Sequence, residues 1–259
     1  MADVTVNPHF NDIQGPPTTY GSVKQSPGET HMHEESSTST TTMYIGVALI
    51  QVLGIVAVAL SIVWTHNYLH GFSWDGSGKN FNWHVVCMTL FIFMYGNAAL
   101  VYRVARRTEK TRAKIIHALV NLLALLFAVV GLVAVFRFHN HGNIANVYSI
   151  HSWIGIGTVA LYACQFVFGF SVFLFPRMSS AGLRRAYLNV HVYFGGVMLA
   201  LVVVAAVSGI TEKMLFAFKP VYPKFVAVTY VGNLFGVSVV MFAMGVGYVL
   251  FNGSWKRIN

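Results

Sequence analysis

Six long runs of apolar residues decide what this chain can fold into. Each exceeds or approaches the ~18 to 20 residues that cross the ~30 Å hydrocarbon core of a bilayer as an α-helix. Of the 259 residues, 56% are hydrophobic and only 10% are charged, whereas about a quarter are charged in soluble domains. The predicted spans are residues 43–65, 83–104, 115–136, 150–175, 188–211 and 225–251. The sequence therefore predicts an all-α integral membrane protein with six transmembrane helices.

The first 42 residues have a different composition from the rest of the chain. They are rich in Ser, Thr, Pro and Gly, and they hold five of the eight acidic residues against a single basic residue, Lys24. Such a segment lacks the apolar surface whose burial would offset the entropy cost of folding. The sequence therefore predicts a disordered tail over residues 1–42, followed by one six-helix transmembrane domain over residues 43–257. Because no apolar signal core precedes the first span, that span is expected to insert as an uncleaved anchor.

The distribution of basic residues predicts which ends of the spans face the cytosol. The formal net charge is +9, but the surplus lies at alternate ends of the spans and indicates no nucleic-acid partner. Clusters follow the second, fourth and sixth spans: Arg103, Arg106, Arg107, Lys110, Arg112 and Lys114, then Arg177, Arg184 and Arg185, then Lys256 and Arg257. The opposite ends hold only Lys79, Arg137, Lys213, Lys219 and Lys224. Since positive residues accumulate on the cytoplasmic side, both termini are predicted to be cytosolic.

Four of the eleven histidines lie within the first residues of a span. His84 and His151 open the second and fourth spans, which both enter the bilayer from the non-cytoplasmic side. His117 and His191 open the third and fifth spans, which both enter from the cytosol. The four positions therefore reduce to two pairs, one near each membrane face. They lie on the second to fifth spans, which are expected to form a central four-helix bundle, and facing helices of a bundle are where cofactor sites are built.

Two histidine pairs at matched depths favour haem ligation. A single histidine in a membrane span is more often a packing residue or a proton relay. Neutral imidazole is also the most common metal ligand, but a zinc site needs four ligands, and no Asp or Glu lies at either level inside the spans. Two imidazoles complete the coordination of a haem iron, and a haem with both axial positions filled transfers electrons.

Two other classes of protein also carry histidines in membrane helices or span the membrane with six helices: a non-redox transporter and a structural or scaffold protein. In a non-redox transporter, the membrane histidines would relay protons or bind a transition metal. The spans are nearly free of acidic residues, with only Glu212 at one end, which disfavours that reading. A structural or scaffold protein would not explain histidines at matched depths.

Two glycines indicate space for a flat macrocycle. The pattern His-x-aromatic-x-Gly occurs as HSWIG and HVYFG, which places Gly155 four residues after His151 and Gly195 four residues after His191. A residue at i+4 lies on the same helix face as the histidine, so glycine removes the side chain that a porphyrin would strike. Close helix packing explains either glycine alone, but the repetition at both levels favours haem.

Several motifs together resemble those of the cytochrome b561 family, over residues 45–257. They are FNWH, ALVYR, KIIHALVN, VGLVAVFRFHNHGNIANVYSIHSWIG, GFSVFLFP, NVHVYFG, GITEKMLF and the closing WKR. The stretch around FHNHG is most similar to the animal duodenal and lysosomal members. The resemblance implies six helices, two b-type haems held in the central bundle, ascorbate as electron donor and a homodimer.

The resemblance also implies site residues. It assigns one haem to His84 with His151 and the other to His117 with His191, the pairing that the topology predicts. It places a cytosolic ascorbate site at Lys110, Lys114 and Arg184, with Arg103 and Tyr102 nearby. It places an acceptor site on the other side at His139, Asn146 and Tyr148. His139 and Lys114 are expected to act directly on the substrates.

The expected function is transmembrane electron transfer from cytosolic ascorbate through two haems to a non-cytoplasmic acceptor. Ferric iron is the favoured acceptor, on the sequence FHNHGNIANVYSIHSW. Monodehydroascorbate, re-reduced inside a vesicle, is the alternative. The expected location is the plasma membrane or the membrane of a late endosome, lysosome or secretory vesicle.

Overall fold

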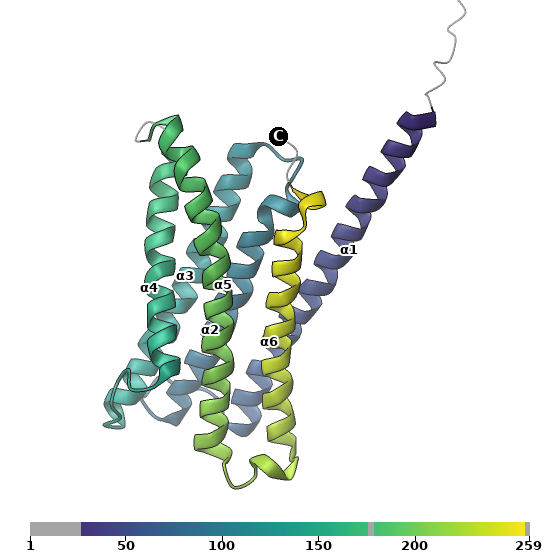
Figure 1. The fold of residues 1–259 in the computed structure, drawn as a ribbon. Coiled ribbons are helices and arrows are strands. Elements are labelled where there is room, and N and C mark those ends of the chain that lie inside the picture. Colours follow the sequence, from purple (N-terminus) through teal and green to yellow (C-terminus); the bar gives the residue numbers. More distant parts are fainter. Residues whose placement is uncertain (1–26, 176–178, 257–259) are drawn as a thin grey trace, which may run out of the picture. The chain divides into compact units, whose positions relative to one another are not determined.

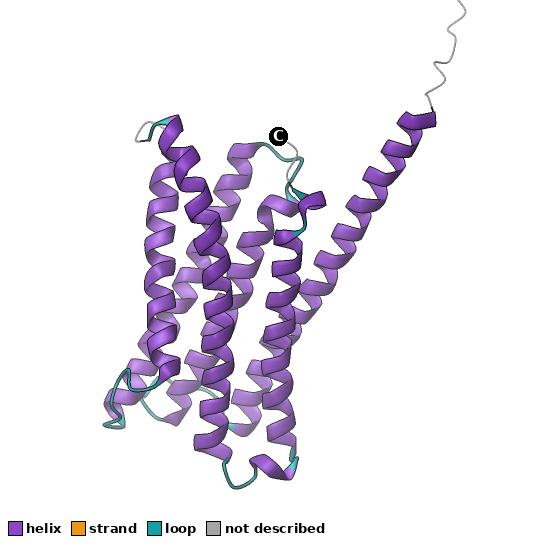
Figure 2. Cartoon of the chain, in the orientation of Figure 1, coloured by secondary structure: helices purple, strands orange, loops and turns teal. Residues whose placement is uncertain are grey.

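The computed structural model describes residues 27–175 and 179–256, and within these ranges the chain is helical with no strand (Figures 1 and 2). The long helices are α1 Pro27–Val63, α2 Gly78–Val104, α3 Lys110–His141, α4 Ile150–Leu174, α5 Ala181–Phe218 and α6 Ala227–Phe251. Six segments in the described ranges are long and apolar enough to cross a membrane. The predicted six-span, all-α fold is therefore confirmed.

Several helices extend beyond the apolar runs that predicted them. The sequence predicts a third span over 115–136, whereas α3 covers Lys110–His141. It predicts a fifth span over 188–211, whereas α5 covers Ala181–Phe218. Hydropathy detects the part of a helix that suits the hydrocarbon core, but polar residues can continue the helix into the interface, and a side-chain cap can stabilise its end. Ser180 supplies such a cap, because its side chain accepts a hydrogen bond from the backbone N–H of Leu183.

The first helix also begins earlier than its apolar run. The sequence places residues 27–42 in the disordered tail, but the structure starts α1 at Pro27, and proline suits the first position of a helix. Adding a residue to an existing helix costs far less than nucleating a new one, so the membrane span can carry its helix into a polar segment. Residues 1–26 lie outside the described residues, and their disorder stays a prediction.

Helices α2, α3, α4 and α5 form a closed four-helix bundle, in which each packs against two of the others. The α2–α3 contact is the most extensive and is lined by small residues of α3. Ala124 and Ala128 are fully buried, and a Cβ added to Gly131 would lie 3.3 Å from the Cβ of Cys87. Small residues let two membrane helices approach closely, so the first two bundle helices lie in tight antiparallel contact.

Glycines also seat the two remaining helices on the bundle. A Cβ on Gly96 of α2 would lie 2.6 Å from the Phe242 ring of α6. A Cβ on Gly54 of α1 would lie 2.4 Å from the Phe93 ring, and one on Gly245 of α6 would lie 2.6 Å from Ile50. Helix α6 packs against α2 and α5. These contacts leave the interior of the bundle to α2–α5.

A fully buried amide fixes the entry into α2. Helix α1 is followed by a short π-helix, Trp64–Tyr68, and the chain then runs through residues 69–77 to reach α2. The Nδ2 group of Asn82 donates to the carbonyls of Leu69 at 2.8 Å and Gly71 at 2.5 Å. Because water is absent from the membrane interior, such carbonyls need an internal donor. Asn82, two residues before His84, therefore ties the first turns of α2 to the segment that follows the π-helix.

Candidate functional site

The first histidine pair, His84 of α2 and His151 of α4, faces the interior of the bundle near one end. The ring centroids are 6.1 Å apart and the ring planes are nearly perpendicular, at 86°. The Nδ1 of His84 is 3.0 Å from the carbonyl oxygen of Gly131 on α3, and that of His151 is 2.8 Å from the carbonyl oxygen of Ala205 on α5. A carbonyl only accepts, so each Nδ1 must donate, and each Nε2 is left with a free lone pair.

The second histidine pair, His117 of α3 and His191 of α5, has nearly the same separation. Its ring centroids are 6.2 Å apart, with an angle of 65° between the planes. The Nδ1 of His117 lies 2.8 Å from the carbonyl oxygen of Ala98 on α2. The Nδ1 of His191 is buried and has no hydrogen-bond partner among the described residues. Three of the four rings are thus oriented by a carbonyl of the neighbouring helix.

The antiparallel packing places the two pairs at opposite ends of the bundle. His84, near the start of α2, contacts Gly131 in the second half of α3. His117, near the start of α3, contacts Ala98 in the last turns of α2. The pairing that the sequence predicts from topology is therefore the pairing that the structure brings together.

Two glycines outside the predicted motifs pack against the imidazole rings of His151 and His191. A Cβ on Gly209 of α5 would lie 2.5 Å from Cε1 of His151, and a Cβ on Gly169 of α4 would lie 3.0 Å from Cε1 of His191. In the α4–α5 pair, each helix therefore supplies one histidine. Each helix also supplies a glycine that packs against the histidine of the other helix. No local motif marks these glycines, because they are set by the register between two helices.

The two glycines that the sequence did select differ. Gly155 has open space where a Cβ would be, and it lines a cavity beside the first pair. Gly195 is packed: a Cβ there would lie 3.5 Å from the side-chain nitrogen of Gln165, and its carbonyl accepts a hydrogen bond of 2.5 Å from the hydroxyl of Tyr95. The expected open face is found at the first pair and not at Gly195.

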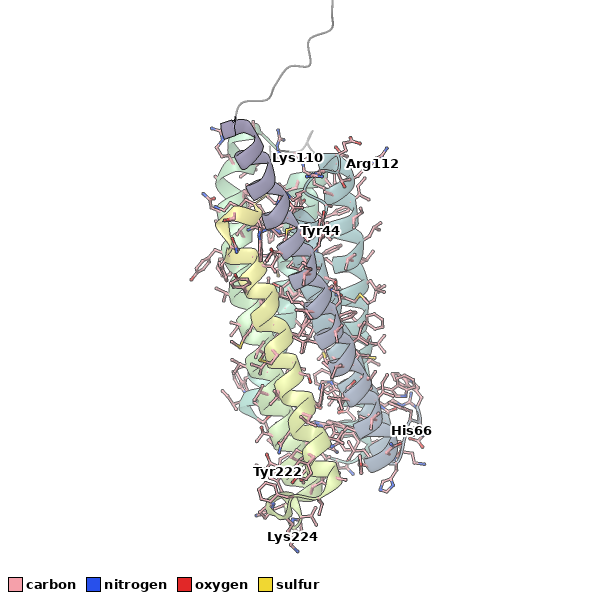
Figure 3. The ribbon with its side chains drawn as sticks, turned by 90° about the vertical axis from the view of Figure 1, so that its right-hand side faces the viewer. Tyr44, His66, Lys110, Arg112, Tyr222 and Lys224 are labelled. Carbon is pink, nitrogen blue, oxygen red and sulfur yellow. The ribbon has the colours of Figure 1, made fainter. Side chains whose placement is uncertain are left out.

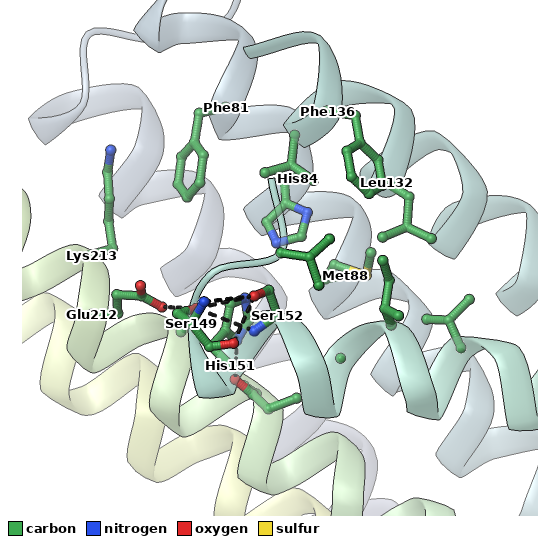
Figure 4. Close-up of a pocket in the computed structure, with 18 of the residues that line it drawn as sticks. Phe81, His84, Met88, Leu132, Phe136, Ser149, His151, Ser152, Glu212 and Lys213 are labelled. Carbon is green, nitrogen blue, oxygen red and sulfur yellow. Dashed lines mark hydrogen bonds between the residues drawn. The ribbon is translucent and has the colours of Figure 1, made fainter. Parts of the chain in front are cut away.

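The cavity beside the first pair has a volume of about 320 Å³ and is lined by residues of α2, α3, α4 and α5 (Figure 4). Its walls are mostly apolar, including Phe81, Met88, Leu132, Phe136 and Phe216. A few polar groups converge on it: His84, His151, His139, Tyr148, Glu212 and Lys213. Small-molecule and cofactor sites have this composition, a largely apolar wall with a few placed polar groups.

Two of the three predicted acceptor-site residues lie together at this cavity. His139 belongs to the last turn of α3, and its ring stacks on that of Tyr148 with centroids 6.3 Å apart. Partial burial raises the pKa of the Tyr148 phenol, and the carboxylate of Glu212 raises that pKa further. The third residue, Asn146, is exposed and is not among the residues that line the cavity; its side chain donates to that of Asn140 at 2.8 Å.

A capping box fixes the start of α4 just before His151. The side chain of Ser149 accepts from the backbone of Ser152, and the side chain of Ser152 accepts from the backbone of Ser149. The hydroxyl of Ser149 also donates to Glu212 Oε2 at 3.1 Å. These bonds tie α4 to α5 at the level of the first pair.

Aromatic rings and cations surround the second pair. The ring centroid of Tyr102 is 5.3 Å from that of His117, and those of Phe173 and Tyr187 are 5.4 and 5.9 Å from that of His191. Lys114, one turn before His117, donates from Nζ to the carbonyl oxygen of Phe173 at 3.1 Å.

The cations predicted to bind ascorbate gather at this end. The positive charges of Lys110 and Arg184 lie close enough to repel the ammonium group of Lys114. Lys110 lies at the opposite end of the bundle from His66 and Lys224 (Figure 3). Arg103 points elsewhere: its guanidinium donates to the carbonyl of Leu250, which joins the end of α2 to the end of α6.

An aromatic cluster fills the bundle between the two pairs. The ring centroids of Phe91, Tyr95 and Tyr162 are 5.0 to 6.1 Å apart, and all three side chains are buried. The hydroxyl of Tyr162 donates to Oδ1 of Asn121 at 2.6 Å, and Nδ2 of Asn121 donates to the carbonyl of His117 at 2.7 Å. The centre of the bundle is therefore close-packed and linked to the second pair by hydrogen bonds.

The sequence model of the eukaryotic cytochrome b561 family matches residues 83–217. The chain belongs to the cytochrome b561 family. The matched range starts one residue before His84 and ends beyond Lys213, so it contains both pairs and the residues that support them. Membership of this family implies a haem cofactor, and the six spans make this cytochrome b561 a multi-pass membrane protein.

Curated relatives cover most of this cytochrome b561. It is 42% identical over 220 residues to the human lysosomal membrane ascorbate-dependent ferrireductase CYB561A3, which is 83% of this chain and 90% of the human protein. It is 43% identical over 209 residues to the plasma membrane ascorbate-dependent reductase CYBRD1 of Xenopus laevis, 79% of this chain and 74% of that protein. It is 41% identical over 212 residues to the mouse transmembrane ascorbate-dependent reductase CYB561, 82% of this chain and 84% of that protein.

Proposed function

We propose that this cytochrome b561 transfers electrons across a membrane from ascorbate to ferric iron, by way of two haem b groups. The observation that carries the proposal is the presence of two facing histidine pairs at opposite ends of one bundle. One buried pair would serve a single cofactor, whereas two pairs at opposite ends supply a route through the bilayer. The names of the human and Xenopus relatives, an ascorbate-dependent ferrireductase and an ascorbate-dependent reductase, support the same reaction.

The donor set fits a haem at each pair. A metal ion about 2 Å from one nitrogen of each of two opposed imidazoles would separate the ring centroids by about 6 Å, and the observed separations are 6.1 and 6.2 Å. In the described residues, no three His, Cys, Asp or Glu side chains gather to hold a metal ion, so each pair would rely on a porphyrin for the remaining ligands. Haem with two axial histidines supplies one-electron transfer.

The residues of the chain orient and shield these sites. The carbonyls of Gly131, Ala205 and Ala98 fix three of the four imidazoles with Nδ1 as the donor, which also raises the basicity of the ligating nitrogen. The mostly apolar cavity wall would limit the access of water to the first pair. The ring contacts of Phe91, Tyr95 and Tyr162 fill part of the space between the two pairs.

The cationic end beside the second pair would bind ascorbate, which is an anion. Lys110, Lys114 and Arg184 provide the positive charge, and Tyr102 lies against His117. The basic residues at this end favour a cytosolic orientation for it, and with it a cytosolic location for both termini. Lys114 is the cation that lies nearest in sequence to a ligand of the second pair, and its role is to hold the donor beside that pair.

The opposite end would receive ferric iron. His139 and Tyr148 line the cavity that also holds His84 and His151, and a neutral imidazole is suited to bind a transition metal. Asn146 would take part only if its segment moved toward the cavity. The relatives named for the lysosomal and plasma membranes favour one of these two locations, and the family resemblance favours a homodimer.

Proteoliposomes test the reaction directly. Holoprotein is reconstituted with ascorbate inside and ferric citrate outside, and ferrous iron is measured outside with a chromogenic chelator, after the fraction of molecules with the cytosolic face inward has been determined. We expect iron reduction that depends on both ascorbate and protein. If monodehydroascorbate were reduced efficiently while ferric citrate was not, the acceptor would be monodehydroascorbate. If ascorbate reduced neither haem, the proposal would fail.

Charge-neutral variants test the donor site. Replacing Lys114 with Gln should raise the KM for ascorbate several-fold while the haem content stays normal. The matched control is Arg112→Gln, because Arg112 is exposed at the same end and is paired with Glu109. Equal kinetics for the two variants would show that Lys114 contributes to membrane topology and not to ascorbate binding.

A further inference from the structure

Lys213 brings a positive charge into the cavity beside the first histidine pair. It follows Glu212 on α5 and lines the cavity. Its Nζ lies 4.2 Å from the ring centroid of Phe81 and 6.0 Å from that of Phe138. Figure 4 shows the lysine extending alongside Phe81, whose ring lies between it and His84 in this view. The charge is therefore directed into the cavity wall and not into open solvent.

This lysine has no carboxylate partner in the described ranges. The ion pair found there is Arg112 with Glu109, at the opposite end of the bundle. The neighbouring Glu212 is engaged elsewhere, since it accepts a hydrogen bond from Ser149 at 3.1 Å and interacts with Tyr148. Figure 4 shows the two side chains diverging from α5. The acid that could neutralise Lys213 thus points away from it.

A partly buried ammonium group without a counter-ion is costly. Aromatic faces offset some of the lost hydration through cation–π attraction, but they provide no oxygen acceptor for the three N–H groups of the ammonium. The remaining requirement is for an anion with oxygen acceptors. Since the groups that lie against Nζ are the rings of Phe81 and Phe138, a bound molecule would supply such an anion.

We infer that Lys213 is the anion-binding residue of this cavity and that its ligand is a carboxylate. The inference rests on the proposed function, which supplies two sources of that chemistry. One source is a propionate of the haem held by His84 and His151. The other is the carboxylate of an anionic electron acceptor, such as ferric citrate, that docks at His139 and Tyr148.

Three variants of the holoprotein test this assignment: Lys213→Gln, Lys213→Arg and the control Lys219→Gln. Lys219 lies six residues further along at the same end and is exposed, so its loss changes the net charge equally without touching the cavity. Two measurements are made on each. One is the midpoint potential of each haem by spectroelectrochemical titration. The other is the KM for ferric citrate and for hexaammineruthenium(III), a cationic acceptor.

The two sources give different results. If a haem propionate is the ligand, Lys213→Gln lowers the midpoint potential of one haem, because a nearby positive charge stabilises the reduced state, and both acceptors respond alike. If the acceptor is the ligand, both potentials stay unchanged and the KM for ferric citrate rises several-fold, while that for hexaammineruthenium(III) does not rise. Lys213→Arg restores the wild-type value in either case.

The assignment is overturned if Lys213→Gln matches Lys219→Gln in potentials and in both KM values. The potential measurement needs no substrate, so it stands even if the wild-type protein fails to reduce ferric citrate and the proposed acceptor is wrong. If Lys213→Gln lost haem, wild-type haem content and potentials in Lys213→Arg would still support a charge-based role. Abnormal potentials in both variants would indicate a packing role and contradict the assignment.

Discussion

The two histidine pairs have the same spacing but different surroundings. At the first pair, both imidazoles donate to a backbone carbonyl, and an apolar cavity with one unpaired lysine lies beside them. At the second pair, only His117 has a carbonyl partner among the described residues. Aromatic rings enclose the second pair, and three cations gather at its end of the bundle.

This difference teaches how one bundle builds two sites with distinct tasks. The spacing of the rings depends on helix packing, which is repeated because α2 with α3 and α4 with α5 are both antiparallel pairs. The surroundings depend on individual side chains, which are not repeated. Ring spacing should therefore decide whether haem binds, and the surroundings should decide what each site exchanges electrons with.

Removing a histidine should have the largest effect. We expect His84→Ala and His151→Ala to lose the same haem, and His117→Ala and His191→Ala to lose the other, because each ring pair faces one shared space. The haem-to-protein ratio should fall from two to one in each variant, and low-temperature spectra should show which haem remains. Loss of the same haem from His84→Ala and His117→Ala would refute the pairing.

Adding a methyl group behind a ligand should have a smaller, graded effect. Gly209→Ala would put a Cβ 2.5 Å from the His151 ring, and Gly169→Ala would put one 3.0 Å from the His191 ring. Overpacking of this kind costs about 1 to 3 kcal/mol, so Gly209→Ala should lower the unfolding temperature and the haem occupancy of the first pair more than Gly169→Ala does for the second.

The control for these variants is Gly157→Ala, because a Cβ at Gly157 of α4 would meet nothing within 4 Å. It tests the general effect of alanine in these helices, which should be slightly favourable. If Gly209→Ala behaved like Gly157→Ala, contact with the opposite helix would not hold the His151 ring in place.

The sequence predicts the coarse features of this comparison because they depend on short-range patterns. Apolar length gives the spans, and alternation of entry side assigns His84 with His151 and His117 with His191. The positions of Lys110, Lys114 and Arg184 at one end follow from the same reasoning. None of these inferences needs the register between helices.

The features that the sequence does not predict all need that register. The acceptors for Nδ1 are backbone carbonyls, which every residue carries, so Ala98 and Ala205 have no distinguishing side chain. Gly169 and Gly209 contact histidines on another helix, and no local motif relates them. From the sequence, Lys213 counts only as one of the few basic residues at the non-cytoplasmic ends of the spans, because its contact with Phe81 depends on how α5 packs against α2.

Removing one hydrogen bond beside the second pair should have a smaller effect, and that effect should be confined to the second pair. Tyr162→Phe removes the hydroxyl that donates to Oδ1 of Asn121. Asn121 is buried, and its Nδ2 donates to the carbonyl of His117. Leaving that oxygen unpaired should cost about 1 kcal/mol. We expect a modest fall in unfolding temperature and a spectral or potential shift confined to the haem of the second pair.

Tyr193→Phe is the matched control, because Tyr193 lies on the exposed surface of α5. It removes a hydroxyl from the same kind of side chain without touching the interior. A shift at both haems in Tyr162→Phe would show that the aromatic cluster supports the two pairs equally.

The smallest expected effect is a pH response at the end of the bundle that carries the first pair. In the loop before α2, the side chain of Asp75 accepts hydrogen bonds from the hydroxyl of Ser73 at 2.6 Å and the N–H of Ser77 at 2.9 Å. These bonds, that from Ser73 first, hold the pKa of the Asp75 carboxyl well below its usual range. The next residue, Gly76, lies against the His141 ring of α3, since a Cβ there would be 2.8 Å from its Cγ.

A carboxyl whose pKa is lowered on folding contributes stability that is complete above its unfolded pKa of about 3.9 and is lost as the pH falls toward its folded pKa. Wild-type protein should therefore lose unfolding temperature more steeply than Asp75→Asn below about pH 4, while the difference between them stays constant above that. Thermal unfolding in detergent from pH 3 to 7 measures this. Parallel curves down to pH 3 would show that the carboxylate charge does not stabilise the loop, and the pH response would then give no distinction between the two ends.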